Sequence, residues 1–328
     1  GHEVIALGAD SYTSVMGNNV TSPVMIDWTN RCELTTVCQK VGLVIHAAGP
    51  NASDCLSRKT SAVTFHDRYT RPLLEACKLA NVTRFFFLSS VHVYSSEFLG
   101  SYDEESPTLN NHPYAQMKID GEKMVAAYRE GGLHYFNLRL SNVIGYPVTP
   151  RIKAWDLVAN DYALQLARFN KITIKSEKSS SRDFLPMSDF LNAIDLLGNL
   201  KKIPHDFTFN VCSASCTSVA DLASLFVEQW HELTGQRSKL TFLQNRDKSD
   251  HCFGQFLIKN DRLRRLNFSN SGSFINFLAT SPTFIGSHLA NPKQDNGALK
   301  NTLKRYVGSS IDKRGIESRQ LKTFLQAP

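Results

Sequence analysis

An α/β fold with a doubly wound parallel sheet is the class that this sequence predicts, and three observations support it. In the first half, short apolar runs alternate with segments of helical periodicity, which is the pattern of repeated strand–helix units. One apolar run, Gly42–Gly49, ends in small residues. Another ends at Ser90 and is followed by Tyr114 and Lys118, four positions apart. Beyond about Pro150 the elements become shorter and more polar, which predicts a second, smaller α+β domain.

The expected elements follow from these runs in chain order. Strands are expected where apolar residues are bounded by polar or small ones, at Glu3–Leu7, Val24–Asp27, Leu43–His46, Arg84–Ser89 and His134–Leu140. Helices are expected between them, at Cys32–Lys40, Thr64–Ala80 and Tyr114–Glu130. A further strand and a further helix are expected at Phe207–Val211 and Val219–Trp230.

The residues before Lys118 predict the start of a helix that carries chemistry. Asn111 suits the N-cap, and Pro113 suits the first turn, where a missing N–H costs nothing. Tyr114 and Lys118 then lie one turn apart on the same face. An ammonium beside a phenol lowers the tyrosine pKa from about 10 toward the range of a general base. With the Ser90 hydroxyl, these groups can move a proton to and from an alcohol. The alternative is a surface tyrosine and lysine on an amphipathic helix.

The small residues after the strand at Leu43–His46 indicate a ligand site. Ala47, Ala48 and Gly49 would let a flat ligand approach the backbone at the carboxyl edge of a parallel sheet, where such folds bind ligands. A tight turn without a ligand is the alternative.

Composition limits the classes of function. The 328 residues are 42% hydrophobic and 20% charged, which is ordinary for a globular protein of one large or two unequal domains. No run of apolar residues is long enough for a transmembrane helix. The net charge of +7 is dispersed and lacks a nucleic-acid-binding signature, so we expect an anionic small substrate and no nucleic acid. The 7 cysteines lack metal-site spacing, which predicts reduced thiols in a cytoplasm and no metal.

Several motifs occur in one order along the chain. They are His46–Gly49, Ser89–Tyr94, Tyr114-x-x-x-Lys118, Leu138–Gly145, Arg182-Asp183-Phe184 and Phe209–Val211. Together they resemble the extended short-chain dehydrogenases/reductases, and most of all the NAD-dependent epimerase/dehydratase group that acts on nucleotide sugars. The resemblance runs from residue 1 to about 230 and more weakly to about 306, where residues 291–300 look like the family's closing helix. It implies a Rossmann-like fold and an NAD(P)-dependent epimerase or dehydratase.

The resemblance implies a role for each catalytic candidate. Tyr114 would be the acid/base, Lys118 would hold ribose hydroxyls and tune the tyrosine, and Ser90 would orient the substrate hydroxyl. His92 stands where dehydratases carry an extra acid/base group. Packing or substrate contact is the alternative role for that imidazole.

The resemblance also implies the binding residues. Those that would bind the cofactor are Asp27 and Trp28 at the adenine ring, Ala47, Ala48 and Gly49 along the diphosphate and ribose, Leu140 near the nicotinamide, and Leu88, Tyr114 and Lys118. Those that would bind the substrate are Ser90, His92, Tyr114, Asn142 and Arg182, of which the last two match positions that often hold phosphate groups.

The sequence departs from the family at its beginning. The family opens with a strand and a G-x-x-G-x-x-G turn that holds the pyrophosphate, and neither is found here. We therefore expect a truncated member that begins at the family's second strand. Gly8 stands where NAD-preferring members carry an acid, and Asp10 is only a displaced candidate. No clear arginine is found there either, so the choice between NAD and NADP stays open, with NAD favoured. Tyr69 and Ser95 each replace a usual glycine.

The resemblance divides the chain into two expected domains. Residues 1–150 would bind the dinucleotide, with 183–212 returning to this domain. Residues 151–182 and 213–328 would form the substrate domain and C-terminal tail. Two alternatives stay open, a hydroxysteroid- or flavonol-type reductase and a non-catalytic dinucleotide-binding regulatory homologue. A homodimer is the expected assembly if the family's common interface is kept.

Overall fold

The computed structural model describes residues 2–8, 24–57, 62–129, 134–145, 153–175, 180–243 and 256–270. The expected closing helix at 291–300 lies outside these residues. The chain divides into two compact units, the first formed by 1–143, 181–217 and 251–273, and the second by 144–180, 218–250 and 274–328. None of the helices in the described ranges combines the length and apolar character that a membrane crossing requires.

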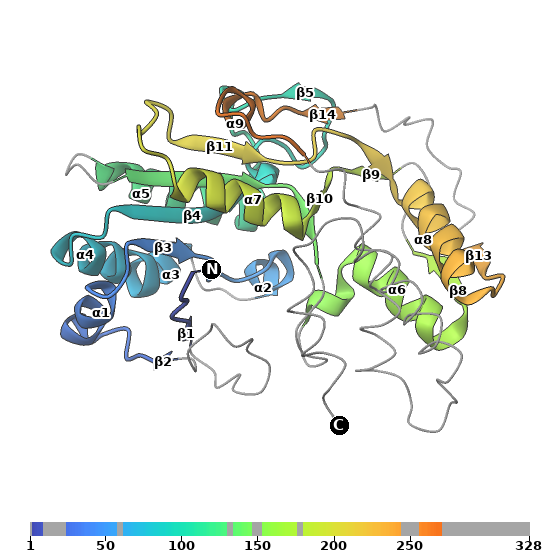
Figure 1. Cartoon of the computed structure of the whole chain (residues 1–328), viewed down its shortest axis with the longest axis horizontal. Helices are drawn as coiled ribbons and strands as arrows, with labels where there is room; N and C mark the ends of the chain where they lie inside the picture. Colours follow the sequence, from blue (N-terminus) through green and yellow to red (C-terminus); the bar gives the residue numbers. More distant parts are fainter. Residues whose placement is uncertain are drawn as a thin grey trace, which may run out of the picture. The chain divides into compact units, whose positions relative to one another are not determined.

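A four-stranded parallel sheet forms the centre of the first unit (Figure 1). Its strands in spatial order are β11 (Thr208–Val211), β6 (His134–Leu140), β4 (Arg84–Ser90) and β3 (Leu43–His46). The register places Ser90 of β4 beside Leu140 of β6. Because all four strands run in the same direction, their carboxyl ends meet at one edge.

The first two strands are shorter than expected. β1 covers Leu7–Gly8 and β2 covers Val24–Met25, so the bounds predicted for both strands are wrong. In the described part of the chain, β1 and β2 pair in parallel with each other, and β3 pairs with β4 alone. Ile45 of β3 is 43% exposed. A strand with one neighbour has fewer backbone partners to extend it, which accounts for the short ladders.

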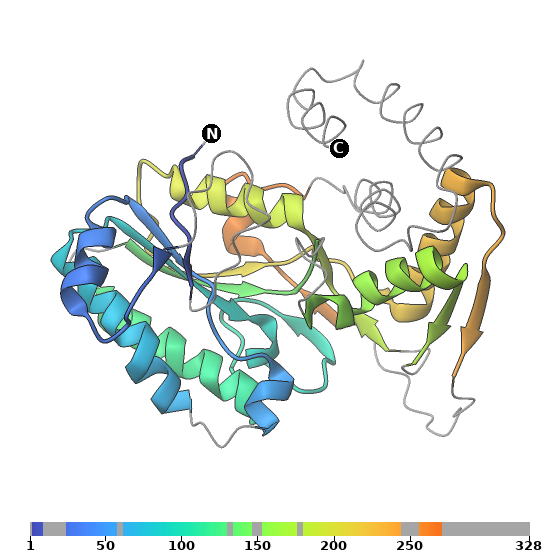
Figure 2. The same ribbon diagram turned by 90° about the horizontal axis from the view of Figure 1, so that it is seen from below.

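Helices α1, α4 and α5 cover one face of the sheet (Figure 2). They span Arg31–Cys38, Arg71–Leu79 and Pro113–Ala127, and the short α3 spans Ala62–Phe65. The helix expected at Thr64–Ala80 is interrupted by a π-helical turn over His66–Thr70. Phe85, Phe87 and Tyr135 point toward this face and form its core with Leu34 and Leu74.

Helices α7 (Met187–Gly198) and α9 (Asp261–Arg265) cover the other face. Phe86, Phe136 and Leu138 point toward it, so consecutive residues of β4 alternate between the two cores. A sheet covered on both faces explains why its strands are almost continuously apolar. The remaining elements of this unit are α2 (Ala52–Ser57), a 3-10 helix (Val91–Val93), β5 (Gly100–Tyr102), β9 (Ser181–Arg182), β10 (Phe184–Pro186) and β14 (Phe256–Ile258).

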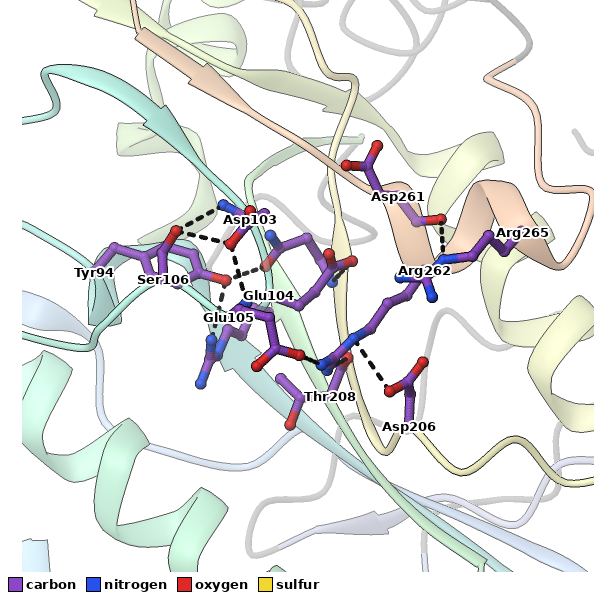
Figure 3. A network of polar contacts seen from close by, with 12 residues as sticks. Tyr94, Asp103, Glu104, Glu105, Ser106, Asp206, Thr208, Asp261, Arg262 and Arg265 are labelled. Carbon is purple, nitrogen blue, oxygen red and sulfur yellow. Dashed lines mark hydrogen bonds and ion pairs between the residues drawn. The ribbon is translucent and has the colours of Figure 1, made fainter.

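The segment that carries β14 and α9 is tied to the sheet by an arginine (Figure 3). β14 pairs in parallel with β5. Arg262 donates to the carbonyl of Thr208 at 2.9 Å, forms an ion pair with Glu105, and lies 3.5 Å from a carboxylate oxygen of Asp206. The guanidinium therefore links β11 to the loop after β5.

The second unit has a small α/β core of its own. β8 (Lys171–Ile174) and β13 (Lys239–Phe242) pair in parallel, and α6 (Val158–Phe169) and α8 (Val219–Thr234) pack against them. A 3-10 helix covers Lys153–Asp156, while β7 (Asn142–Ile144) and β12 (Thr217–Ser218) begin in the first unit and end in the second. Asn170 and Gly235, with φ of 49° and 72°, end α6 and α8 in the left-handed conformation.

Candidate active site

Helix α5 begins with a histidine cap. His112 Nδ1 accepts a hydrogen bond from the backbone N–H of Tyr114 at 3.1 Å, and Pro113 follows as the first helical residue. Asn111 was expected to be the N-cap, and that prediction is wrong. The reason is a contact from elsewhere in the chain, because Asn110 donates to the carbonyl of His92 at 2.6 Å and accepts from His112 N at 2.9 Å. This fixes the turn so that His112 reaches the helix start.

The three groups expected to transfer a proton lie together. Ser90 is at the carboxyl end of β4, and its hydroxyl is close enough to the Tyr114 phenol to lower the pKa of that phenol. The Lys118 ammonium lies 5.6 Å from the centre of the Tyr114 ring and donates to the carbonyl of Leu88 at 2.8 Å. Ser90 Oγ also accepts from the backbone N–H of His92 at 3.2 Å. A phenol, a hydroxyl and an ammonium thus meet at the carboxyl edge of the sheet.

The small residues after β3 reach the same place. Ala47, Ala48 and Gly49 are exposed. A Cβ atom at Gly49 would lie 3.7 Å from Lys118 Nζ and 3.8 Å from Met117 Cε, so the absence of a side chain leaves open space against the ammonium. Leu140 lies beside Ser90 in the sheet and is partly buried, like Leu88. The edge expected to bind a flat ligand is therefore lined by these residues.

The electrostatics of the pair differ from the expectation. Burial raises the pKa of Tyr114, and the hydrogen bond from Ser90 offsets this only in part, so the predicted lowering is wrong for the ligand-free protein. Burial also lowers the pKa of Lys118 to about 8. The spacing in the sequence is correct, but the ammonium lies against the ring and bonds a carbonyl instead of the phenolic oxygen.

His92 and Arg182 form a second group of predicted residues. The His92 ring packs on Phe98, with ring centres 5.6 Å apart. Burial lowers the pKa of His92, and the positive charge of Arg182 lowers it further. Arg182 donates to the carbonyl of Ser181, and burial lowers its pKa. The positive charge of Arg182 thus acts on the neutral His92 imidazole, and such a cation favours an anionic occupant.

Asn142 and the two residues expected at the adenine ring, Asp27 and Trp28, are the remaining predicted binding residues. The Asn142 side chain donates to the carbonyl of Asp183 at 3.0 Å, so one of its donors is used within the fold. Asp27 follows β2 and accepts from the backbone and hydroxyl of Thr29, which lower its pKa. Trp28 meets Tyr69 edge to face, with ring centres 5.6 Å apart. Asp27 and Trp28 follow the separate β1–β2 pair and have no contact with Tyr114 among the interactions of the described residues.

Sequence analysis missed several groups near this edge. Cys55 of α2 is partly buried; burial raises its thiol pKa, and the nearby Lys118 ammonium opposes that change. Glu122, one turn beyond Lys118, is buried and paired with Arg139. A single cysteine gives no signal in a sequence, whereas Glu122 could have been found from its spacing to Lys118. No cluster of metal-binding side chains occurs within the described ranges.

The comparisons with known proteins identify relatives. The family model named NAD dependent epimerase/dehydratase family matches residues 1–212. The chain is 27% identical over 214 residues to an uncharacterized UDP-glucose epimerase, YtcB, of Bacillus subtilis, and this alignment covers 64% of each protein. It is 27% identical over 194 residues to the human dTDP-D-glucose 4,6-dehydratase, and this alignment covers 58% of this chain and 53% of the relative. The chain thus matches less than two thirds of the length of these relatives.

A solved structure gives an independent comparison of the fold. The UDP-glucose 4-epimerase of Thermotoga maritima, solved with UDP-glucose, aligns with a TM-score of 0.71 at 20% identity and covers 88% of this chain and 92% of its own. At this identity the likeness shows the fold alone. The expected α/β fold with a Rossmann-like parallel sheet is confirmed.

Proposed function

This chain belongs to the NAD dependent epimerase/dehydratase family, and from that premise we propose that it oxidises a hydroxyl of a nucleotide sugar with NAD. The product would be an epimer or a dehydrated keto-sugar. One observation carries the proposal. Ser90, Tyr114 and Lys118 lie together at the carboxyl edge of the sheet, with the Ser90 hydroxyl beside the phenol and the Lys118 ammonium 5.6 Å from the centre of its ring.

The residues at this edge fit a dinucleotide. Gly49 has no side chain, and its backbone lies next to the Lys118 ammonium, since a Cβ atom there would be in van der Waals contact with Nζ. An ammonium has three N–H donors, and the Leu88 carbonyl takes one of them. Within the described part of the chain no second acceptor contacts it, so two donors face a ligand. Ribose hydroxyls suit them, and Leu140 beside Ser90 gives an apolar contact for a ring.

Proton transfer falls to Tyr114 and Ser90. The substrate hydroxyl would donate to the Tyr114 phenolate, while Ser90 hydrogen-bonds the same oxygen. NAD would supply the hydride acceptor and, in its oxidised form, a positive charge. Because burial raises the pKa of Tyr114, the phenol stays protonated in the ligand-free protein. It becomes a base only when positive charge is added nearby, which couples deprotonation of Tyr114 to cofactor binding.

The substrate class follows from charge. Arg182 is close enough to His92 to lower its pKa, and we infer that Arg182 holds a phosphate of the nucleotide. Asn142 would hold the sugar or phosphate with the amide groups that Asp183 leaves available. We assign cofactor binding to residues 1–150 with 183–212, and substrate binding to 151–182 and 213–328.

His92 separates the two reactions. An imidazole with its pKa lowered by burial is neutral near pH 7 and can pass a proton in either direction. Loss of water from a keto-sugar needs such a group, whereas epimerisation does not. Replacement of His92 by Asn should therefore abolish a dehydratase reaction and leave an epimerase reaction within about tenfold.

The test is turnover by the Tyr114→Phe variant. Purified protein is incubated with NAD and UDP-glucose or dTDP-glucose, and the products are separated by chromatography. We expect the variant to lose at least about a hundredfold in kcat, because general acid–base catalysis contributes that much, while its NAD affinity stays within about threefold. Tyr128→Phe, at the other end of α5, is the matched control and should leave turnover within about twofold.

Each other outcome selects an alternative. Normal turnover by Tyr114→Phe would remove the proposed mechanism. Turnover of a steroid or flavonol alone would favour the reductase reading. NAD binding without turnover of any substrate would favour a regulatory homologue. A homodimer and a cytoplasmic location stay hypotheses from the resemblance, and light scattering of the purified protein tests the first.

A further inference from the structure

A buried hydrogen-bonded bridge joins the end of β3 to helix α5, and nothing in the proposed chemistry uses it. His46 Nε2 lies 3.0 Å from the hydroxyl of Thr70, and the same hydroxyl lies 2.9 Å from His66 Nδ1. His66 Nε2 lies 2.7 Å from the carbonyl of Met117. The three side chains are at most 3% exposed. We name them the His46–Thr70–His66 bridge.

The direction of every hydrogen bond in the bridge follows from its end. The Met117 carbonyl can only accept, so His66 carries its proton on Nε2. Burial lowers the pKa of His66, so the ring is neutral at pH 7, its Nδ1 is a lone pair, and the hydroxyl of Thr70 donates to it. That hydroxyl has no second proton, so His46 donates from Nε2. Both imidazoles are therefore protonated on Nε2.

The electrostatics agree with this assignment. Burial lowers the pKa of His46 to about 3, assisted by the charge of Lys118. Burial also lowers the pKa of His66. A protonated His66 would donate from Nδ1 to the Thr70 hydroxyl and reverse the direction of the bridge. Because burial lowers the pKa of both imidazoles, the bridge stays unchanged from about pH 7 upward.

The bridge ends where α5 needs to be held. Met117 precedes Lys118, and the helix lies very close to β4 at Gly121. A Cβ atom at Gly121 would lie 2.3 Å from Phe87 Cζ and 2.9 Å from His66 Cε1. Such close packing sets the distance between helix and sheet, but a glycine against a flat ring leaves sliding along the helix axis open. The directional bond from His66 to Met117 opposes that sliding.

Helical spacing explains how His66 and Thr70 can both point inward. Residues four apart on a helix share one face, and His66 and Thr70 are the first and last residues of the π-helical turn. Such turns are frequent at functional sites.

We propose that the His46–Thr70–His66 bridge is a positioning device that fixes α5 along its axis, and with it Lys118 against Gly49 and the Leu88 carbonyl. It touches neither substrate nor cofactor in this scheme, so its members are positioning residues. The proposal rests on the proposed function for its kinetic consequence alone. Its hydrogen-bond pattern can be tested in the resting protein.

The first experiment needs no substrate. Long-range ¹H–¹⁵N NMR of the histidine-labelled full chain reports the tautomer of each imidazole. We expect two neutral rings protonated on Nε2, unchanged between about pH 7 and pH 9, and perturbed together in Thr70→Val. A ring at His66 that is protonated on Nδ1, or that titrates in this range, would overturn the proposal.

The second experiment is kinetic and uses matched pairs. His66→Leu removes the donor to Met117, whereas His66→Gln keeps an N–H at about the same distance. We expect His66→Leu to lower kcat by about tenfold to a hundredfold with the nucleotide-sugar KM within about threefold, because a misplacement of about 1 Å has that effect. His66→Gln should recover kcat to within about threefold. Thr70→Val and Thr70→Ser form a second pair, with loss expected in the first and recovery in the second.

The outcomes separate the two proposals. Equal loss in His66→Leu and His66→Gln, or unchanged kcat in His66→Leu and Thr70→Val, would overturn the positioning role. If His66→Leu does not fold, the Thr70 pair decides. No turnover by the unmodified chain would overturn the proposed function, and the tautomer measurement would still decide the bridge.

Discussion

Lys118 and Glu122 lie one helical turn apart on α5, and each is 7% exposed, yet the partners that surround their charges differ. Glu122 is fully partnered. Its carboxylate accepts from Arg139 Nε at 3.0 Å and Nη2 at 2.8 Å, and from the hydroxyl of Ser89 at 2.5 Å. Lys118 donates to the neutral Leu88 carbonyl and lies over two aromatic rings. The two side chains are equally buried, but the charge of Glu122 is fully compensated by its partners and the charge of Lys118 is only poorly compensated.

The difference shows which of two buried charges is available for chemistry. Burial alone would lower the pKa of Arg139, but the hydrogen bonds and charge of Glu122 raise it above the usual value, so that pair stays ionised. Burial lowers the pKa of Lys118 to about 8, so this ammonium sits close to its titration point. A perturbed, poorly compensated group at a sheet edge is typical of a functional site, whereas a saturated ion pair is typical of a framework.

The largest effect should come from breaking the compensated site. Arg139→Met leaves the Glu122 carboxylate buried without its cation, and we expect the free energy of unfolding to fall by about 3–5 kcal/mol. Denaturant titration followed by circular dichroism measures it. Arg71→Met removes an exposed ion pair with Asp67 and should change stability by less than about 1 kcal/mol. A loss below about 1 kcal/mol in Arg139→Met would mean that the two charges are compensated alike.

The opposite sign is expected at Lys118. Lys118→Met removes a buried charge that costs stability near pH 7, so we expect the protein to gain roughly 1–3 kcal/mol while turnover is lost. Lys123→Met, on the exposed side of the same helix, should change neither quantity appreciably. Denaturant titration and the product assay give both values. A destabilised Lys118→Met protein would show that the ammonium is a structural group like Arg139.

The fold was predictable where local patterns decide it. β3 and β6 have the expected bounds, because apolar runs bordered by polar residues set their ends. β1 and β2 do not, because ladder length depends on neighbouring strands that the local sequence does not describe. The cap of α5 moved from Asn111 to His112 for a similar reason, since the Asn110–His92 contact is non-local.

The site was predictable in position and less so in electrostatics. Spacing brought Ser90, Tyr114 and Lys118 to one edge, but spacing does not report burial, so the direction of the Tyr114 pKa was wrong. The His46–Thr70–His66 bridge was missed because two of its three hydrogen bonds join residues that are 24 and 51 positions apart. The π-helical turn over His66–Thr70 also has no recognisable signal in the sequence.

The smallest expected effect is a change of folding stability with pH that comes from Lys118 and not from the Arg139–Glu122 pair. The Lys118 pKa is about 8 in the folded protein, below its usual value of 10.5, so the unfolded chain binds more protons between these values. Folding stability should therefore rise with pH in this window, by about 1 kcal/mol between pH 7.5 and 9. Lys118→Met should lack this rise, and subtracting its pH dependence of stability from that of the wild type cancels the other titrating groups. Arg139→Met should keep the rise. Turnover should fall over the same range, because the neutral amine no longer supports the Tyr114 phenolate. If folding stability changed with pH in the same way in wild type and Lys118→Met, the titrating group would be another residue. The proposed difference between Lys118 and Glu122 would then be wrong.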